Sequence, residues 1–149
     1  AVFNLYELSQ EIVFNIDEWS KIISDASAVI YQFPFYWMSA PSLLKKWQDE
    51  VFTFLSKTPA VAGKPLTVVT TTGSEYEAYR SGGRNRFTTD ELLRPYQVNA
   101  IHSGMSWQTP IVVYGMGTAD AGKNIAEGAN LYKQRVEMLI GNSNAGNNW

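Results

Sequence analysis

Aromatic residues are concentrated between positions 31 and 41, in the segment YQFPFYWMSAP. Five of these eleven residues are aromatic, and Pro34 removes one backbone donor and stiffens the chain between them. Such rings either fill a core between a strand and the next helix, or present flat faces and backbone amides to a planar ligand. Because Phe35, Tyr36 and Trp37 directly follow an apolar run, where the chain must reverse, we favour the ligand platform for the group as a whole.

A second segment, VVTTTGSEYEAYRSGGRNRF, places small polar residues after another apolar run. The absence of bulky side chains allows a ligand to approach the backbone closely. The hydroxyls and amides can bond to the edge of a heteroaromatic ring or to an anion. These small residues are Thr71, Thr72, Gly73 and Ser74. An ordinary turn after a strand is the alternative, and neither a P-loop nor a GxGxxG pattern is present.

Three arginines, Arg80, Arg84 and Arg86, surround a Gly-Gly pair in the same segment. They can receive a phosphate group, although a solvated surface loop is the simpler interpretation. The single histidine, His102, has no carboxylate at helical spacing, so we interpret it as structural. With no cysteine and one histidine in the chain, thiolate, iron–sulfur and His-rich metal sites are excluded, and we predict no metal site.

The composition is that of one globular domain spanning residues 1–149, with 45% apolar residues available for a core. A formal net charge of −2 argues against a nucleic-acid partner, which would require a basic face. No apolar run approaches the roughly 20 residues that a membrane helix needs. The absence of cysteine fits a reducing compartment, and we expect a cytoplasmic protein.

Apolar runs alternate along the chain with amphipathic segments. Strands are predicted at residues 2–8, 27–33, 65–71 and 110–115. Helices are predicted at residues 17–25, 41–55, 88–104 and 118–140. The last three apolar runs are continuous, as in parallel strands that are covered on both faces. This order predicts a three-layer α/β sandwich in which ligands bind beyond the carboxyl ends of the strands. Three loops follow strand ends and are therefore candidate binding loops: FPFYWMSA, TTGSEYEAY and GMGTAD.

Finer features of the helices follow from residue spacing. Thr88 and Glu91 form a capping-box pattern, and Pro95 predicts a kink or a later start of the same helix. The apolar stripe of the helix at 41–55 is Leu43, Leu44, Trp47, Val51 and Phe54. The apolar stripe of the last helix is Ile125, Ala129, Tyr132, Val136 and Leu139 or Ile140.

Four segments, in this order, resemble the flavodoxin-like NAD(P)H:quinone oxidoreductases, the family that contains DT-diaphorase, the modulator-of-drug-activity proteins and the ancillary oxidoreductases of potassium-efflux systems. They are QFPFYWMSAPSLLKKWQDEVFTF, VVTTTGSEYEAY, RFTTDELLRPYQVNAIHSGM and PIVVYG. The resemblance covers roughly residues 3 to 140. It implies a flavodoxin-like sandwich with a parallel sheet, and a flavin, FMN or FAD, held non-covalently at the carboxyl edge.

The resemblance also implies which residues hold the flavin. The backbone and rings around the isoalloxazine are those of Pro34, Phe35, Tyr36, Trp37 and Met38. The polar edge of the ring is held by Thr71, Thr72, Gly73 and Ser74. Tyr79 matches the family tyrosine near a flavin carbonyl and is the catalytic hydroxyl that we nominate. Thr72 stands where the family usually has Gly, and residues 83–85 contain no counterpart of a histidine that assists hydride transfer in some members.

Two family features have no counterpart in the sequence. The first strand and the phosphate-binding loop of the fold are absent, and we expect a segment to precede Ala1. A longer loop over the active site is also missing, and we expect further residues near Leu55 to Thr58.

By resemblance, the function is two-electron, ping-pong reduction of a quinone or another planar acceptor by NAD(P)H, in a homodimer. The alternatives are a flavodoxin-type electron carrier, which a strongly acidic face would favour, and a regulatory flavoprotein subunit of a membrane transporter. FMN against FAD, NADH against NADPH, and the acceptor stay open.

Overall fold

The computed structural model describes residues 1–6 and 13–144, which form a parallel sheet with helices on both faces. The central strand β2 (Pro65–Thr71) pairs with β1 (Val29–Pro34) along its whole length. On its other side it pairs with β3 (Ser106–Trp107) near its start and with β4 (Ile111–Val113) near its end. The strands predicted at 27–33, 65–71 and 110–115 are confirmed.

The strand predicted at residues 2–8 is wrong as far as the structure describes it. Residues 1–6 form no strand, and residues 7 and 8 lie outside the described ranges. Val2 and Tyr6 are exposed, and the Phe3 ring contacts Trp19, with 5.4 Å between the ring centroids. The two-residue strand β3 was not predicted, because a run of two residues carries no periodicity.

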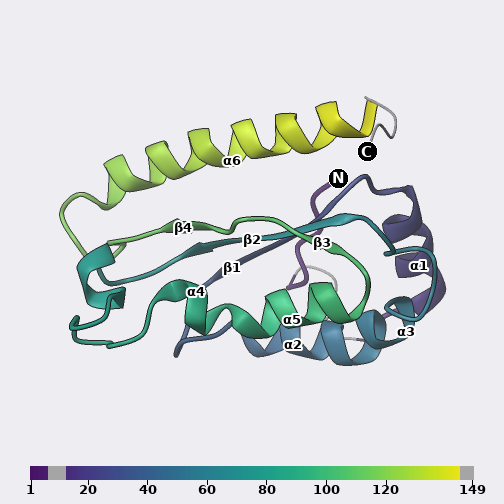
Figure 1. The fold of residues 1–149 in the computed structure, drawn as a ribbon, viewed down its shortest axis with the longest axis horizontal. Coiled ribbons are helices and arrows are strands. Elements are labelled where there is room, and N and C mark those ends of the chain that lie inside the picture. Colours follow the sequence, from purple (N-terminus) through teal and green to yellow (C-terminus); the bar gives the residue numbers. More distant parts are fainter. Residues whose placement is uncertain (7–12, 145–149) are drawn as a thin grey trace.

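Helices form the two outer layers around the sheet, as predicted (Figure 1). The helix α6 (Ala121–Asn144) lies on one face, and α2 (Ser42–Trp47), α3 (Thr53–Leu55), α4 (Thr89–Leu92) and α5 (Arg94–His102) lie on the other. The remaining long helix, α1 (Ile16–Asp25), stands at one end of the sheet. Within the described residues, no helix is both long and apolar enough to cross a lipid bilayer.

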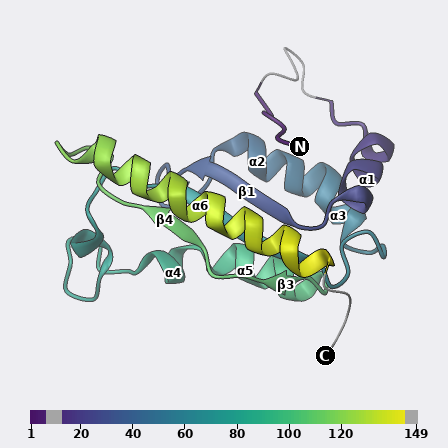
Figure 2. The same cartoon turned by 90° about the horizontal axis from the view of Figure 1, so that it is seen from above.

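The cover on the α6 face is incomplete. Figure 2 shows α6 above β4 and the centre of the sheet, while β1 stays visible beside it. Burial follows this arrangement, because β2 is buried from Leu66 to Thr70 whereas Gln32 and Pro34 of β1 are exposed. The prediction of a strand covered on both faces is therefore confirmed for β2 and wrong for β1.

The helix predicted at 41–55 contains a π-helical turn, η1 (Gln48–Phe52), between α2 and α3. A π turn adds a residue to the turn and so rotates the side chains that follow it. As a result Phe52 and Leu55 are buried and Phe54 is 54% exposed, so the predicted place of Phe54 in the stripe is wrong. The other members, Leu43, Leu44, Trp47 and Val51, are buried as predicted.

Residue spacing correctly predicted the start and the break of the helix at 88–104, but it predicted only part of the buried face of the last helix. Thr88 and Glu91 form the capping box of α4, and a break at Leu93 separates α4 from α5, whose first turn contains Pro95. In α6 only part of the stripe faces the sheet: Leu139 is buried, Tyr132 and Val136 are half-buried, and Ile125 and Ala129 are exposed. Gly128 takes their place at the closest approach to β4, where a β-carbon would lie 2.3 Å from a methyl group of Val113.

Candidate functional site

Backbone hydrogen bonds join the loops at the carboxyl ends of β1, β2 and β4 into one edge (Figure 1). The amide of Phe35 donates to the carbonyl of Thr71, and the amide of Thr72 donates to the carbonyl of Val113, each at 2.9 Å. The amides of residues 115, 116 and 117 then donate to the carbonyls of residues 74, 72 and 73 at 2.8 to 2.9 Å. The three predicted loops are thus held together by backbone hydrogen bonds.

The aromatic segment after β1 reverses in a two-residue turn. Tyr36 and Ser39 exchange both backbone hydrogen bonds, at 2.9 and 3.0 Å, around Trp37 and Met38. Trp37 has φ +46° and Met38 has φ +63°, the left-handed geometry of a type I′ turn. Residues other than Gly, Asn and Asp rarely adopt this conformation. The turn therefore holds the Trp37 ring in solvent, 97% exposed, at the carboxyl edge of the sheet.

The predicted platform is divided between solvent and core. Tyr36, Trp37 and Met38 are exposed, whereas Phe35 is buried and its ring lies 6.2 Å from that of Tyr79. Tyr79 is buried as well, and its ring lies 5.9 Å from that of Tyr114. Phe35 therefore belongs to the core next to the turn, and of these rings only those of Tyr36 and Trp37 are exposed to a ligand.

The loop after β2 leaves backbone amides free at the edge, while the side chain of Thr72 is turned inward. Thr72 is 1% exposed, and its hydroxyl donates to the carbonyl of Ser74 at 2.9 Å. Because the Thr72 side chain is buried, it does not cover the face of the loop that a ligand would approach. Gly73 has open space where a β-carbon would stand. In the described part of the chain, the amides of Gly73, Ser74, Trp37 and Met38 donate to no acceptor.

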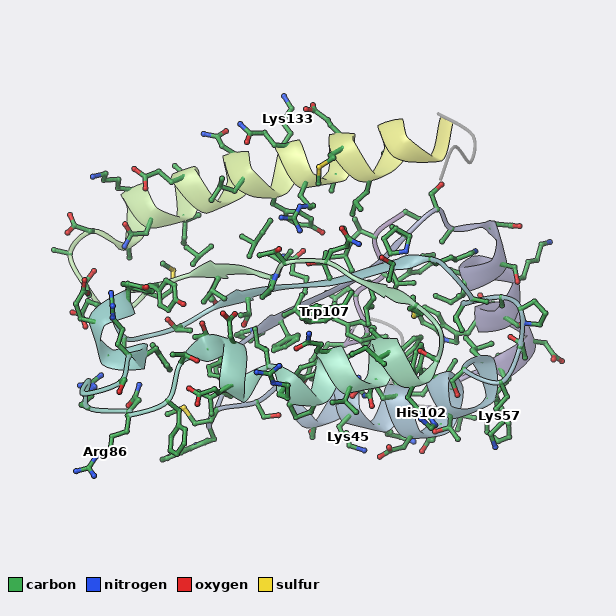
Figure 3. The ribbon with its side chains drawn as sticks, viewed as in Figure 1. Lys45, Lys57, Arg86, His102, Trp107 and Lys133 are labelled. Carbon is green, nitrogen blue, oxygen red and sulfur yellow. The ribbon has the colours of Figure 1, made fainter. Side chains whose placement is uncertain are left out.

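The arginine loop is attached to this same edge through one residue. The guanidinium of Arg84 donates to the hydroxyl of Ser74. Arg80 instead lies over the ring of Tyr76, 5.1 Å from its centroid. Arg86 has φ +61°, and Figure 3 shows its side chain pointing away from the molecule.

A cavity of about 770 Å³ lies beside this edge, along the side of β4 that pairs with no strand in the described residues. Residues of α4, α6 and the short helix η2 (Tyr76–Tyr79) complete its walls. Tyr79 and Tyr114 line it, whereas none of residues 34–38 or 71–74 does. The Tyr114 hydroxyl lies 2.6 Å from that of Thr89, and burial raises the pKa of Tyr114 above its usual value. The Tyr79 ring thus lies between the predicted flavin edge, where it contacts Phe35, and this cavity, which it lines.

His102 and the acidic side chains are the remaining candidates for catalysis or metal binding. His102 is exposed in the last turn of α5, near the opposite end of the molecule from the arginine loop in Figure 3. The described residues contain no group of three or more His, Asp or Glu side chains that could hold a metal ion. The predicted site residues include neither Tyr114 nor residues 115–117, which hydrogen bonds join to the other loops of the edge. The rule that ligands bind beyond strand ends had nevertheless identified the loop that contains them.

The chain is similar to proteins of one known family. The profile of the family described as having a flavodoxin-like fold matches residues 2–136. General stress protein 14 of Bacillus subtilis is 35% identical over 142 residues, which are 93% of this chain and 81% of that protein. A glutathione-regulated potassium-efflux system ancillary protein of Cronobacter sakazakii is 35% identical over 118 residues, 76% of this chain and 64% of that protein.

Solved structures give the same fold. A general stress protein 14 from Treponema denticola, in complex with FMN, has a TM-score of 0.76 at 27% identity, covering 85% of this chain and 74% of that one. An NADPH-quinone reductase from P. pentosaceus has a TM-score of 0.68 at 30% identity, covering 77% and 72%. A protein described as a thermophilic tryptophan halogenase has a TM-score of 0.76 at 36% identity, covering 83% and 73%. The activities that these names give are not all the same.

Proposed function

Because this chain belongs to the flavodoxin-like NAD(P)H:quinone oxidoreductase family, and is an oxidoreductase of that family, we propose that it binds FMN and transfers two electrons from NAD(P)H to a quinone or a similar planar acceptor. The donor and the acceptor use the same place in turn, in a ping-pong sequence. A relative in complex with FMN supports FMN over FAD, and an NADPH-quinone reductase among the similar structures supports the donor and the acceptor class.

The exposed turn at Trp37 and Met38 carries this proposal. A tryptophan that is 97% exposed gains nothing from folding, and its left-handed backbone costs free energy. Strained residues of this kind are found where a ligand is held. The turn lies at the carboxyl edge of a parallel sheet, where ligands of such folds bind.

The residues at this edge fit a flavin. A flat ring system stacks on an exposed indole, and its polar edge carries nitrogen and oxygen atoms that need hydrogen-bond donors. The unpaired amides of Trp37, Met38, Gly73 and Ser74 are such donors, and the joined loops hold them in place. When bound, the flavin supplies the two-electron chemistry, and the protein contributes position and electrostatics.

Tyr79 has a supporting place in this proposal. Its ring is buried between Phe35 and Tyr114, with centroid distances of 6.2 and 5.9 Å. We propose that its hydroxyl bonds to the flavin carbonyl nearest to the Thr71–Ser74 loop. The protein would act as a homodimer in the cytoplasm, a compartment that a chain without cysteine fits.

The test is flavin retention followed by anaerobic mixing with NADPH. We expect the purified full-length protein to carry FMN, and we expect NADPH to bleach its absorbance. Trp37→Ala should weaken FMN binding about tenfold, as loss of one stacking contact predicts. Phe54→Ala is the matched control, because Phe54 is also an exposed ring but lies on α3, away from this edge. A protein that retains no flavin would refute the proposal.

A second candidate is a regulatory flavoprotein bound to a membrane transporter, and the similarity to a potassium-efflux ancillary protein favours it. The same experiment addresses this role and that of a flavodoxin-type carrier. Slow or absent bleaching by NADPH, with flavin retained, would favour the carrier. Co-purification with a membrane transporter would favour the regulatory subunit.

A further inference from the structure

We propose that Arg84 places a positive charge against the polar edge of the flavin ring and thereby favours the reduced flavin. The inference rests on the proposed function, since it concerns the same site. It assigns a role to one of the three arginines of the loop at residues 80–86.

The hydrogen bond to Ser74 places Arg84 at the proposed site. Ser74 belongs to the loop whose free amides face the flavin, and its hydroxyl accepts from the Arg84 guanidinium. A guanidinium has five donors, so one bond to a hydroxyl leaves others for a carbonyl or a ring nitrogen of the ligand. Its position next to Ser74 therefore brings both charge and donors to the polar edge.

The backbone on both sides of Arg84 lies against the η2 segment. Gly83 has no room for a side chain, because a β-carbon would lie 2.2 Å from the carbonyl oxygen of Glu77 and 2.7 Å from that of Ala78. The amide of Asn85 donates to the carbonyl of Ala78 at 3.0 Å. These contacts hold the backbone on both sides of Arg84 against the η2 segment, and the hydrogen bond to Ser74 holds the exposed guanidinium.

The positive charge of Arg84 is not neutralised by a neighbouring carboxylate. Every ion pair in the described part of the chain involves a lysine, and Arg84 takes part in none. Arg80 lies over Tyr76, and Arg86 points into solvent (Figure 3). Of the three arginines, Arg84 alone bonds to the loop at the carboxyl edge.

The chemistry of the flavin explains what this charge does. A flavin that has taken up two electrons and one proton carries one negative charge, spread over its N1–C2 carbonyl edge. A cation near that edge stabilises this form relative to the oxidised ring. Arginine stays protonated at all physiological pH values, so it acts by charge and hydrogen bonding without giving up a proton. This differs from general acid catalysis by a histidine.

The test uses FMN-loaded protein and sulfite, which adds to flavin N5 and leaves the same negative charge on the ring. Sulfite affinity thus reports on the charge without any turnover. We expect Arg84→Gln to weaken sulfite binding about tenfold and to lower the two-electron midpoint potential by about 30 mV, the equivalent of a tenfold change. Arg84→Lys should restore most of both values. Arg86→Gln is the matched control in the same loop and should change neither.

The outcomes separate this inference from the proposed function. Protein that retains FMN and is reduced by NADPH, but whose sulfite affinity is unchanged in Arg84→Gln, refutes the role of Arg84 and leaves the proposed function intact. Equal losses in Arg84→Gln and Arg84→Lys refute it too, because charge would then not be the cause. Protein that binds no FMN refutes both.

Discussion

Replacing Trp37 by Asn should make the flavin-free protein more stable while weakening its binding of FMN. The left-handed conformation costs a residue other than glycine roughly 1–2 kcal/mol, and Asn tolerates it because its short side chain bonds locally. Asn is also the preferred residue at the first central position of a type I′ turn. Since the Trp37 side chain is 97% exposed, its removal sacrifices almost no buried surface.

The expected gain is about 1 kcal/mol in the free energy of unfolding, close to 3 °C in Tm for a domain of this size. Trp37→Ala is the reference variant. It removes the same ring, but alanine does not relieve the left-handed strain. Both variants should lose FMN affinity about tenfold, and only Trp37→Asn should gain stability.

Thermal unfolding of the flavin-free proteins and fluorescence titration with FMN measure the two effects separately. If the flavin-free Trp37→Asn protein is no more stable than Trp37→Ala, the turn stores no strain. If both variants bind FMN as the parent protein does, the exposed ring is not part of the flavin site, and the argument from strain to function fails.

Two further predictions concern the scaffold. Gly128→Ala should destabilise the protein by about 1–3 kcal/mol, because the added methyl group would lie 2.3 Å from Val113 and push α6 away from β4; Gly122→Ala in the same helix meets open space and should be stabilising by about 0.5–1 kcal/mol, and urea unfolding compares the two. Thr88→Ala should cost about 1 kcal/mol through loss of the capping box. Hydrogen bonds from the Thr88 backbone and side chain lower the pKa of Glu91 in the folded protein. The capping box therefore contributes its full stabilisation at a pH above the ordinary pKa of a glutamate. This stabilisation is lost as the pH falls through the lower pKa that Glu91 has in the folded protein. The stability difference between parent and Thr88→Ala should therefore shrink in acid, and equal differences at neutral and acidic pH would contradict this account.

Local patterns predicted the elements that depend on local interactions. The strands at 65–71 and 27–33, the capping box at Thr88 and the break before Pro95 each follow from a few neighbouring residues, and the structure confirms them. The apolar segment at 2–8 looked equally like a strand. Residues 1–6 form none, because a strand also needs a partner edge to pair with, and a pattern within the segment says nothing about one.

Predictions of burial failed where a helix changes its type or where another element decides which face is covered. Phe54 is exposed because a π turn rotates the end of its helix, and Ile125 is exposed because α6 approaches the sheet through Gly128 instead. Spacing identifies one face of a regular helix. It does not reveal a change of helix type or the line along which two elements come into contact.

The sequence by itself determined the fold class and the family and predicted the loops that we propose to form the site, because apolar periodicity, caps and motif order are properties of short segments. It did not distinguish the rings of the aromatic segment from one another. Only the tertiary structure places Phe35 in the core and Trp37 in solvent, through a turn closed by hydrogen bonds between Tyr36 and Ser39. It alone brings Arg84 to Ser74, since contact between side chains ten residues apart depends on how the loop between them is packed.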